Sequence, residues 1–142
     1  MGNINISRWI LGGVVCAVIL FIVDFVLNGV VLMQQWTDAM AALQQPPMGE
    51  SVGQIVFFAI LNLIVGLTAV WIYVGIRPRF GPGMQTAIYA GLATWLIGYL
   101  VPNAFFAATG LFPAYLLWTA IIVGVIQVPV ATVAGAWLYQ EP

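Results

Sequence analysis

The chain contains no histidine, no lysine and a single cysteine, and only 5% of its 142 residues carry charge, against about 25% in a soluble domain. Its only basic residues are Arg8, Arg77 and Arg79. So few charges cannot cover a water-exposed surface, which excludes a soluble enzyme, a nucleic-acid binder and a secreted disulfide scaffold. Because 63% of the residues are apolar, the composition predicts an integral membrane protein.

The missing residue types also limit the chemistry. Without histidine the usual ligands of haem iron, chlorophyll and transition metals are absent. The lone thiol of Cys16 excludes an intrachain disulfide and a two-thiol redox pair. No glycine-rich phosphate loop follows a strand pattern, and no Ser or Thr has a nearby base. We therefore expect no enzyme activity, no catalytic residue, no metal and no dedicated cofactor. A lipid, another apolar ligand, or a chlorophyll held by an amide or carbonyl oxygen stays open.

Long apolar runs take up most of the chain. A helix needs about 20 apolar residues to cross about 30 Å of hydrocarbon. Four segments satisfy that requirement, at residues 9–35, 53–76, 84–108 and 114–139. The ten-residue alternation typical of membrane-spanning strands is absent. The sequence predicts an all-α membrane four-helix bundle that forms one domain over residues 1–142.

The first apolar run follows Arg8, as it would in a secretory signal peptide. The run is longer than the apolar core of a signal peptide, and no small-residue cleavage site with a polar exit follows it. We expect this segment to be retained as the first transmembrane helix.

The arginines predict the orientation. Arg8 precedes the first span, while Arg77 and Arg79 lie between the second and third spans, on the same side of the membrane. Asp38 and Glu50 lie in the loop on the opposite side. The positive-inside rule then places both termini in the cytoplasm. We assign the three arginines to this topological role, with binding of lipid headgroup phosphate as a second role.

Turn residues separate the spans. Ser51 followed by Gln54 forms a capping-box pattern at the start of the second span. Residues 77–83, with two prolines and two glycines, predict a tight turn before the third span. In the long loop after the first span, apolar residues at helical spacing predict a short interfacial helix, with Thr37 or Asp38 as its cap.

Small residues form a stripe along each span at near-heptad spacing, which predicts a left-handed bundle with close helix contacts. On the fourth span the stripe consists of Ala120, Gly124, Gln127, Ala131 and Gly135. We expect Gly124 to let two helix backbones approach each other, and Ile121 to face the lipid.

Five polar side chains lie deep within the spans and form the candidate intramembrane polar site: Asp24, Asn28, Asn62, Asn103 and Gln127. Asp24 lies about 20 Å inside its helix, beyond the reach of the arginines. A buried carboxylic acid without a cation partner keeps its proton and can donate it to an amide. We expect Asp24 to link helices through Asn62 or Gln127. A proton, cation or ligand site and a contact to another subunit are the alternatives.

Two pairs of spans share a local pattern. The second span ends in Trp71-Ile72-Tyr73, and the fourth ends in Trp137-Leu138-Tyr139. This match predicts two repeated helical hairpins. The general preference of Trp and Tyr for the membrane interface is the alternative explanation.

The sequence contains Trp71-Ile72-Tyr73, then Arg-Pro-Arg-Phe-Gly-Pro-Gly at residues 77–83, and then a glycine-rich third span. This pattern resembles small four-helix integral membrane proteins of bacteria with no known activity. The resemblance covers most of the chain. It implies a location in the bacterial cytoplasmic (inner) membrane, and it assigns no activity and no site residue.

Three classes of function follow. The small soluble portion and the large lipid-facing apolar area favour a non-catalytic accessory or structural subunit of a larger membrane complex. A homo-oligomeric transporter of ions or small solutes that uses Asp24 is the first alternative, and a binder of a quinone, carotenoid or lipid is the second. The expected partners are the lipid bilayer and other membrane subunits or further copies of the chain, with no nucleic acid.

Overall fold

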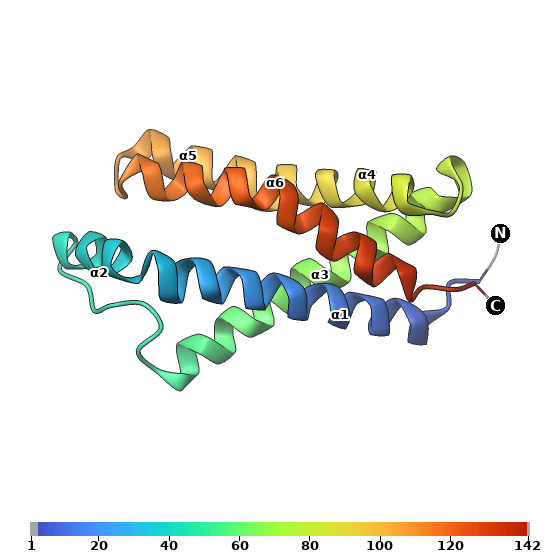
Figure 1. The fold of residues 1–142 in the computed structure, drawn as a ribbon, viewed down its shortest axis with the longest axis horizontal. Helices are drawn as coiled ribbons and strands as arrows, with labels where there is room; N and C mark the ends of the chain where they lie inside the picture. Colours follow the sequence, from blue (N-terminus) through green and yellow to red (C-terminus); the bar gives the residue numbers. More distant parts are fainter. Residues whose placement is uncertain (1–2, 142) are drawn as a thin grey trace.

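The computed structural model describes residues 3–141, and within them the chain is all-helical, with no strand (Figure 1). Four helical spans are long and apolar enough to cross a membrane, which confirms the predicted number of spans. They are Ile6–Val31, Val52–Phe80, Met84–Thr109 and Ala114–Trp137. The first span starts earlier than predicted because Asn5 caps it by accepting the Arg8 N–H at 3.2 Å. It also ends earlier, because the chain bends at Leu32.

The first and third spans each contain a π turn. The first is made of α1 (Ile6–Val26) and η1 (Leu27–Val31), and the third of α4 (Met84–Trp95), η2 (Leu96–Leu100) and α5 (Val101–Thr109). In η1 the Leu32 N–H donates to Leu27 O at 2.8 Å, and in η2 the Val101 N–H donates to Leu96 O. A π turn contains one extra residue, so the side chains that follow it lie on a different face of the helix than they would in a regular α-helix.

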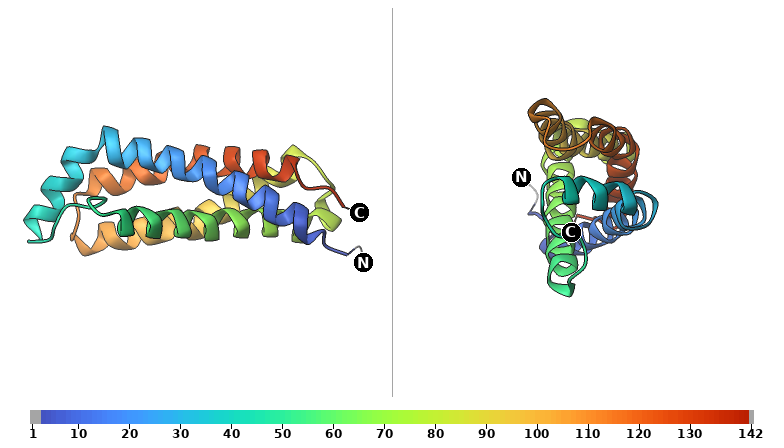
Figure 2. Two further views of the ribbon diagram at one scale, coloured as in Figure 1. Left: turned by 90° about the horizontal axis from the view of Figure 1, so that it is seen from below. Right: turned by 90° about the vertical axis from the view of Figure 1, so that its left-hand side faces the viewer.

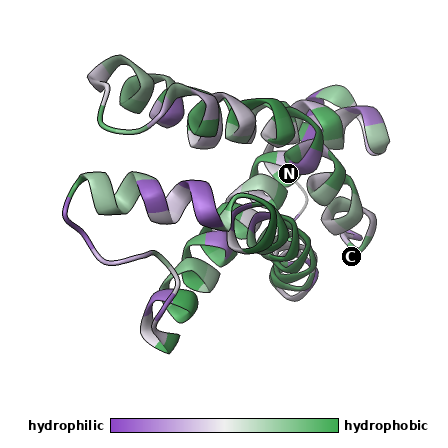
Figure 3. Cartoon of the chain, turned by 60° about the vertical axis from the view of Figure 1, so that its left-hand side comes forward, coloured by the Kyte–Doolittle hydropathy of each residue, from purple (hydrophilic) through white to green (hydrophobic). Residues whose placement is uncertain are grey.

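A short helix, α2 (Met33–Ala42), follows η1, which confirms the helix predicted in this loop. The predicted caps are wrong, because Thr37 and Asp38 lie inside the helix. Thr37 Oγ1 donates to Met33 O at 2.9 Å, and Asp38 accepts from Gln34 Nε2 at 2.8 Å. The helix begins earlier, at Met33, because the chain bends at Leu32 directly after the π turn and Leu32 is the N-cap residue. Hydrophilic residues gather on α2 and the loop that follows it (Figure 3).

The other two spans are uninterrupted helices, α3 (Val52–Phe80) and α6 (Ala114–Trp137). Ser51 Oγ accepts the Gln54 N–H at 3.1 Å, which confirms the predicted cap of α3. The turn predicted at residues 77–83 is shorter than expected, since α3 continues through Pro78 to Phe80. A proline this close to the helix end costs little, and Gly81 and Gly83, both with positive φ, make the turn.

The four spans form a ring in which α1 and α4 each pack against both α3 and α6 (Figures 1 and 2). Glycines make the closest approaches. A Cβ on Gly135 would overlap the backbone oxygen of Gly12, and a Cβ on Gly91 would lie 2.5 Å from Pro129 Cα. Small residues therefore line the helix contacts, as in membrane bundles generally.

A cluster of buried residues forms the core in the half of the bundle next to the two termini, and Leu116, Leu117 and Ile121 are buried farther from them. The members of the core cluster are Cys16, Leu20, Ala69, Val70, Tyr73, Val74, Ala87, Ala90, Val128, Ala131, Ala136 and Tyr139. Away from the termini the first half of α3 leaves the other helices (Figure 1, green). We call residues 52–61 the α3 arm. It contains no buried residue, and Val52 and Phe57 are 78% and 58% exposed.

Candidate functional site

Three side chains from three helical segments meet inside the bundle: Asp24 from α1, Tyr99 from η2 and Gln127 from α6. Gln127 Nε2 donates to Asp24 Oδ1 at 2.7 Å and to Tyr99 Oη at 3.2 Å. The Tyr99 hydroxyl donates to Asp24 Oδ2 at 3.3 Å. The contacts close a ring of hydrogen bonds, which we call the Asp24 cluster (Asp24, Tyr99, Gln127). The predicted link between Asp24 and Gln127 is confirmed.

Gly124 makes room for the Asp24 cluster. A Cβ on Gly124 would lie 3.0 Å from Cδ1 of both Trp95 and Tyr99, so the glycine receives two aromatic rings and not a helix backbone as predicted. Trp95 Nε1 also donates to Ile121 O at 3.0 Å. The prediction that Ile121 faces lipid is wrong: it is 5% exposed, whereas its neighbour Ile122 is 63% exposed.

The other three candidates, Asn28, Asn62 and Asn103, each donate to the carbonyl four residues earlier in their own helix, at 3.1, 3.2 and 2.8 Å. Asn28 Oδ1 in addition accepts from Trp36 Nε1 at 2.9 Å, which ties α2 to the end of the first span. Asn62 faces Asp24 from α3, although its amide nitrogen bonds within α3. Thus Asn62 borders the Asp24 cluster, and Asn28 and Asn103 mainly satisfy their own helices.

No cation lies beside Asp24, since the one ion pair within residues 3–141 joins Arg77 to Glu141 at the terminus end. Both carboxyl oxygens of Asp24 receive a neutral donor. This arrangement suits a carboxylate, and it suits a carboxylic acid equally once the hydrogen bond to Tyr99 is reversed. Protonation of Asp24 therefore stays a prediction, tested below.

Sequence reasoning missed Tyr99. Tyrosines usually lie at the membrane interfaces, where the hydroxyl reaches water. Tyr99 instead lies far from both ends of the third span, where its hydroxyl needs a protein partner. A tyrosine in the middle of an apolar span was the signal that could have identified it.

The three arginines differ from one another. Arg8 and Arg79 are exposed, but the Arg77 side chain is only 16% exposed. Its Nη1 lies 2.7 Å from Glu141 Oε1, and its guanidinium stacks over the Tyr139 ring at 5.5 Å from the centroid. Arg77 therefore belongs to the packed structure as well as marking one end of the bundle.

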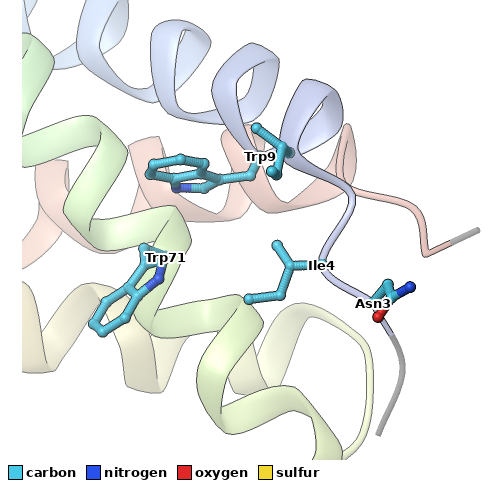
Figure 4. Close-up of a pocket in the computed structure, with 5 residues that line it drawn as sticks. Asn3, Ile4, Trp9 and Trp71 are labelled. Carbon is cyan, nitrogen blue, oxygen red and sulfur yellow. The ribbon is translucent and has the colours of Figure 1, made fainter.

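An apolar groove opens at the same end, between the start of the chain and α3 (Figure 4). It has a volume of about 650 Å³ and is lined by Asn3, Ile4, Ile6, Trp9 and Trp71. Trp9 Nε1 donates to Leu67 O at 2.9 Å, which holds its ring against α3. Such a lining suits a hydrocarbon chain better than a polar substrate.

Comparison with protein-family models, with curated proteins and with solved structures finds no match for this chain. Within residues 3–141 no three side chains of His, Cys, Asp or Glu lie close enough together to hold a metal ion. Fold and site define an all-helical chain with four apolar, span-length helices around a hydrogen-bonded polar cluster. The resemblance to small bacterial four-helix membrane proteins stays a prediction.

Proposed function

We propose that the protein is a non-catalytic structural subunit of a larger assembly in the bacterial cytoplasmic membrane, and that it binds its partner through the α3 arm. The observation that carries this proposal is the separation of the arm from the bundle. Residues 56, 57, 58, 60 and 61 are all exposed, and at 100° per residue they cover roughly 200° of the helix circumference. The half-buried Ile55 and Ala59 lie on the remaining side. An arm with no buried residue leaves most of its helix surface open to another helix.

The direction of the arm also supports a partner. Its nearest anchor to α1 is Gly66, where a Cβ would overlap the Gly13 carbonyl and the Ala17 backbone. Farther along the arm the next glycine, Gly53, would bring a Cβ near Ser51 Oγ alone, at 3.9 Å, and near no other helix. The packing of the chain itself therefore sets the direction of the arm from one end only, and a neighbouring subunit would hold the other.

A matched pair of variants tests this proposal. Ile60→Trp adds bulk to the arm, and Ile122→Trp adds the same bulk to an exposed position on α6. After mild solubilisation of the native membrane, native mass spectrometry should find the parent with a stoichiometric partner. Ile60→Trp should lose that partner and Ile122→Trp should keep it. A parent that purifies alone as a monomer, or equal retention by both variants, would rule the proposal out.

We also place both termini in the cytoplasm, since Arg8 lies in the first turn of α1 and Arg77 and Arg79 lie in the last turn of α3. These two helix ends lie at the end of the bundle where the chain begins and ends (Figure 1). Gln45→Cys should then react with a membrane-impermeant thiol reagent only from outside the cell. Glu141→Cys should react only after the membrane is opened. Reaction of Gln45→Cys from the cytoplasmic side would reverse the orientation.

Two repeated hairpins fit this topology. Tyr73 and Tyr139, which occupy equivalent positions in the two Trp-x-Tyr segments, contact each other edge to face with ring centroids 6.3 Å apart. Equivalent residues meet in this way when two related units pack around a two-fold axis.

A transporter of protons or small ions remains the second candidate, and the two π turns favour it. η1 begins three residues after Asp24, and η2 contains Tyr99. Such turns are frequent at functional sites. In proteoliposomes a transporter would carry a pH-dependent flux that Asp24→Asn abolishes without loss of folding. Absence of flux through the parent protein would eliminate this candidate.

A further inference from the structure

A second cavity lies where α3 ends, α4 begins and α6 ends. Its volume is about 370 Å³, and its lining includes Tyr73, Arg77, Gly83, Met84, Trp137 and Tyr139. It lies at the terminus end of the bundle, away from the Asp24 cluster and the α3 arm. The proposed function makes no use of it.

Arg77 lines this cavity and contains donor atoms that make no hydrogen bond. Among residues 3–141 its buried Nε and Nη1 have no hydrogen-bond partner. Nη1 is paired with Glu141 by charge at 2.7 Å, without hydrogen-bond geometry. Buried donors without acceptors are costly. The guanidinium fork is therefore suited to an oxygen-rich anion that reaches it from within the cavity.

Further donors point to the same ligand chemistry. Tyr73 Oη accepts the Gly83 N–H at 3.3 Å, which leaves the tyrosine proton available to an acceptor. α4 starts at Met84 with no side-chain cap on Gly83, so N–H groups of its first turn are open to an anion. A cation, a hydroxyl and a helix N-terminus thus surround one cavity.

The rim of the cavity is apolar. Trp137 is 84% exposed and Met84 is also exposed, so both present hydrophobic surface beside a site for an anion. Tryptophan at the end of a span lies at the level of the lipid headgroups. We propose that this cavity binds the phosphate of an anionic phospholipid from the leaflet on the side of the termini, with an acyl chain along Met84 and Trp137.

Glu141 gives the site a built-in competitor. Its carboxylate, on the half-exposed tail, now lies where a phosphate oxygen would meet Arg77. Binding of the lipid requires this carboxylate to move aside. Loss of the Arg77 charge and loss of the Glu141 charge should therefore change lipid binding in opposite directions.

The test uses the full chain in nanodiscs of phosphatidylcholine with phosphatidylglycerol, and native mass spectrometry counts the lipids retained. Arg77→Gln should lower the retention of phosphatidylglycerol about tenfold, the effect of one charge-assisted contact. Arg79→Gln removes the same charge at an exposed position and should change retention less than about twofold. Glu141→Gln should raise retention.

Three results would overturn the proposal. Equal losses in Arg77→Gln and Arg79→Gln would mean that only diffuse charge attracts the lipid. Unchanged or lower retention in Glu141→Gln would contradict competition, and this variant stays informative even if Arg77→Gln does not fold. In nanodiscs of phosphatidylcholine alone, Arg77-dependent binding of millimolar inorganic phosphate that displaces added phosphatidylglycerol would assign the cavity to a free anion.

Discussion

The half of the bundle next to the termini and the half remote from them use similar apolar side chains, yet the close contacts between helix backbones lie in the first half. Gly12, Gly91 and Gly135 lie against the backbone of a neighbouring helix in the packed half. In the open half Gly98 has nothing within 4 Å of a built Cβ, and phenylalanines such as Phe57 point outward. Because lipid removes the hydrophobic drive between helices, only close backbone contact and hydrogen bonds hold them together.

The Asp24 cluster lies between these two halves. On its terminus side Leu20 and Val128 are fully buried, and on the other side the α3 arm departs. Its hydrogen bonds join the first, third and fourth spans where the small-residue contacts end. The comparison teaches that polar contacts replace close backbone packing at the point where helices begin to separate.

The largest effect is expected from Gly135→Leu. The new side chain would overlap the Gly12 backbone and crowd Val70 and Cys16. Backbone cannot give way as a side chain can, so we expect a loss of about 3 kcal/mol or failure to fold. Unfolding in denaturing detergent measures this loss. Gly98→Leu in the open half is the control and should behave like the parent. Equal tolerance at the two positions would remove the distinction between the halves.

A smaller loss is expected from Gly124→Leu at the boundary. Here the obstacles are the Trp95 and Tyr99 rings, which can rotate, so the cost should be about 1–2 kcal/mol. Displacement of Tyr99 should also change its near-ultraviolet signal. Ile122→Leu, at an exposed position of the same helix, should leave both the stability and the near-ultraviolet spectrum unchanged. A destabilisation as large as that of Gly135→Leu would mean that Gly124 also touches a rigid backbone.

Asp24→Leu should cost about 0.6–2 kcal/mol, the range of interhelical hydrogen bonds in membranes. Asp24→Asn keeps a polar group next to Gln127 and removes a potential buried charge, so it should equal or slightly exceed the parent in stability. Infrared spectroscopy at neutral pH should detect a protonated Asp24 carboxyl in the parent. A carboxylate band there would instead indicate a cation or water beside Asp24 and favour the transport candidate.

The smallest effect is expected from Tyr99→Phe. It removes the hydroxyl that Asp24 and Gln127 share and leaves the ring on Gly124. We expect a loss of about 0.6 kcal/mol in detergent unfolding. Tyr115→Phe, at an exposed residue near the start of α6, is the control. A loss above that of Asp24→Leu would show that the hydroxyl holds more than this cluster.

Much of the fold was predictable because it depends on local composition. Four apolar runs of span length, the Ser51 cap and a short helix before residue 43 all follow from residues near one another in the chain. Thr37 and Asp38, which were predicted as caps, lie inside α2, because this helix begins at Met33, two residues after the π turn η1 ends. Ile121 was misplaced because the indole that covers it comes from Trp95 on another span.

The amino-acid sequence by itself determined four helices long and apolar enough to cross a membrane, and the need of Asp24 for a neutral partner, since apolar length and charge are properties of the chain. The tertiary structure alone decided which partner Asp24 meets, that Tyr99 joins it, and that Arg77 is built into a cavity while Arg79 is not. It also decided that the first half of α3 stands apart from the bundle. These outcomes depend on how the helices are rotated and tilted against one another, and that arrangement is set by contacts between residues far apart in the chain.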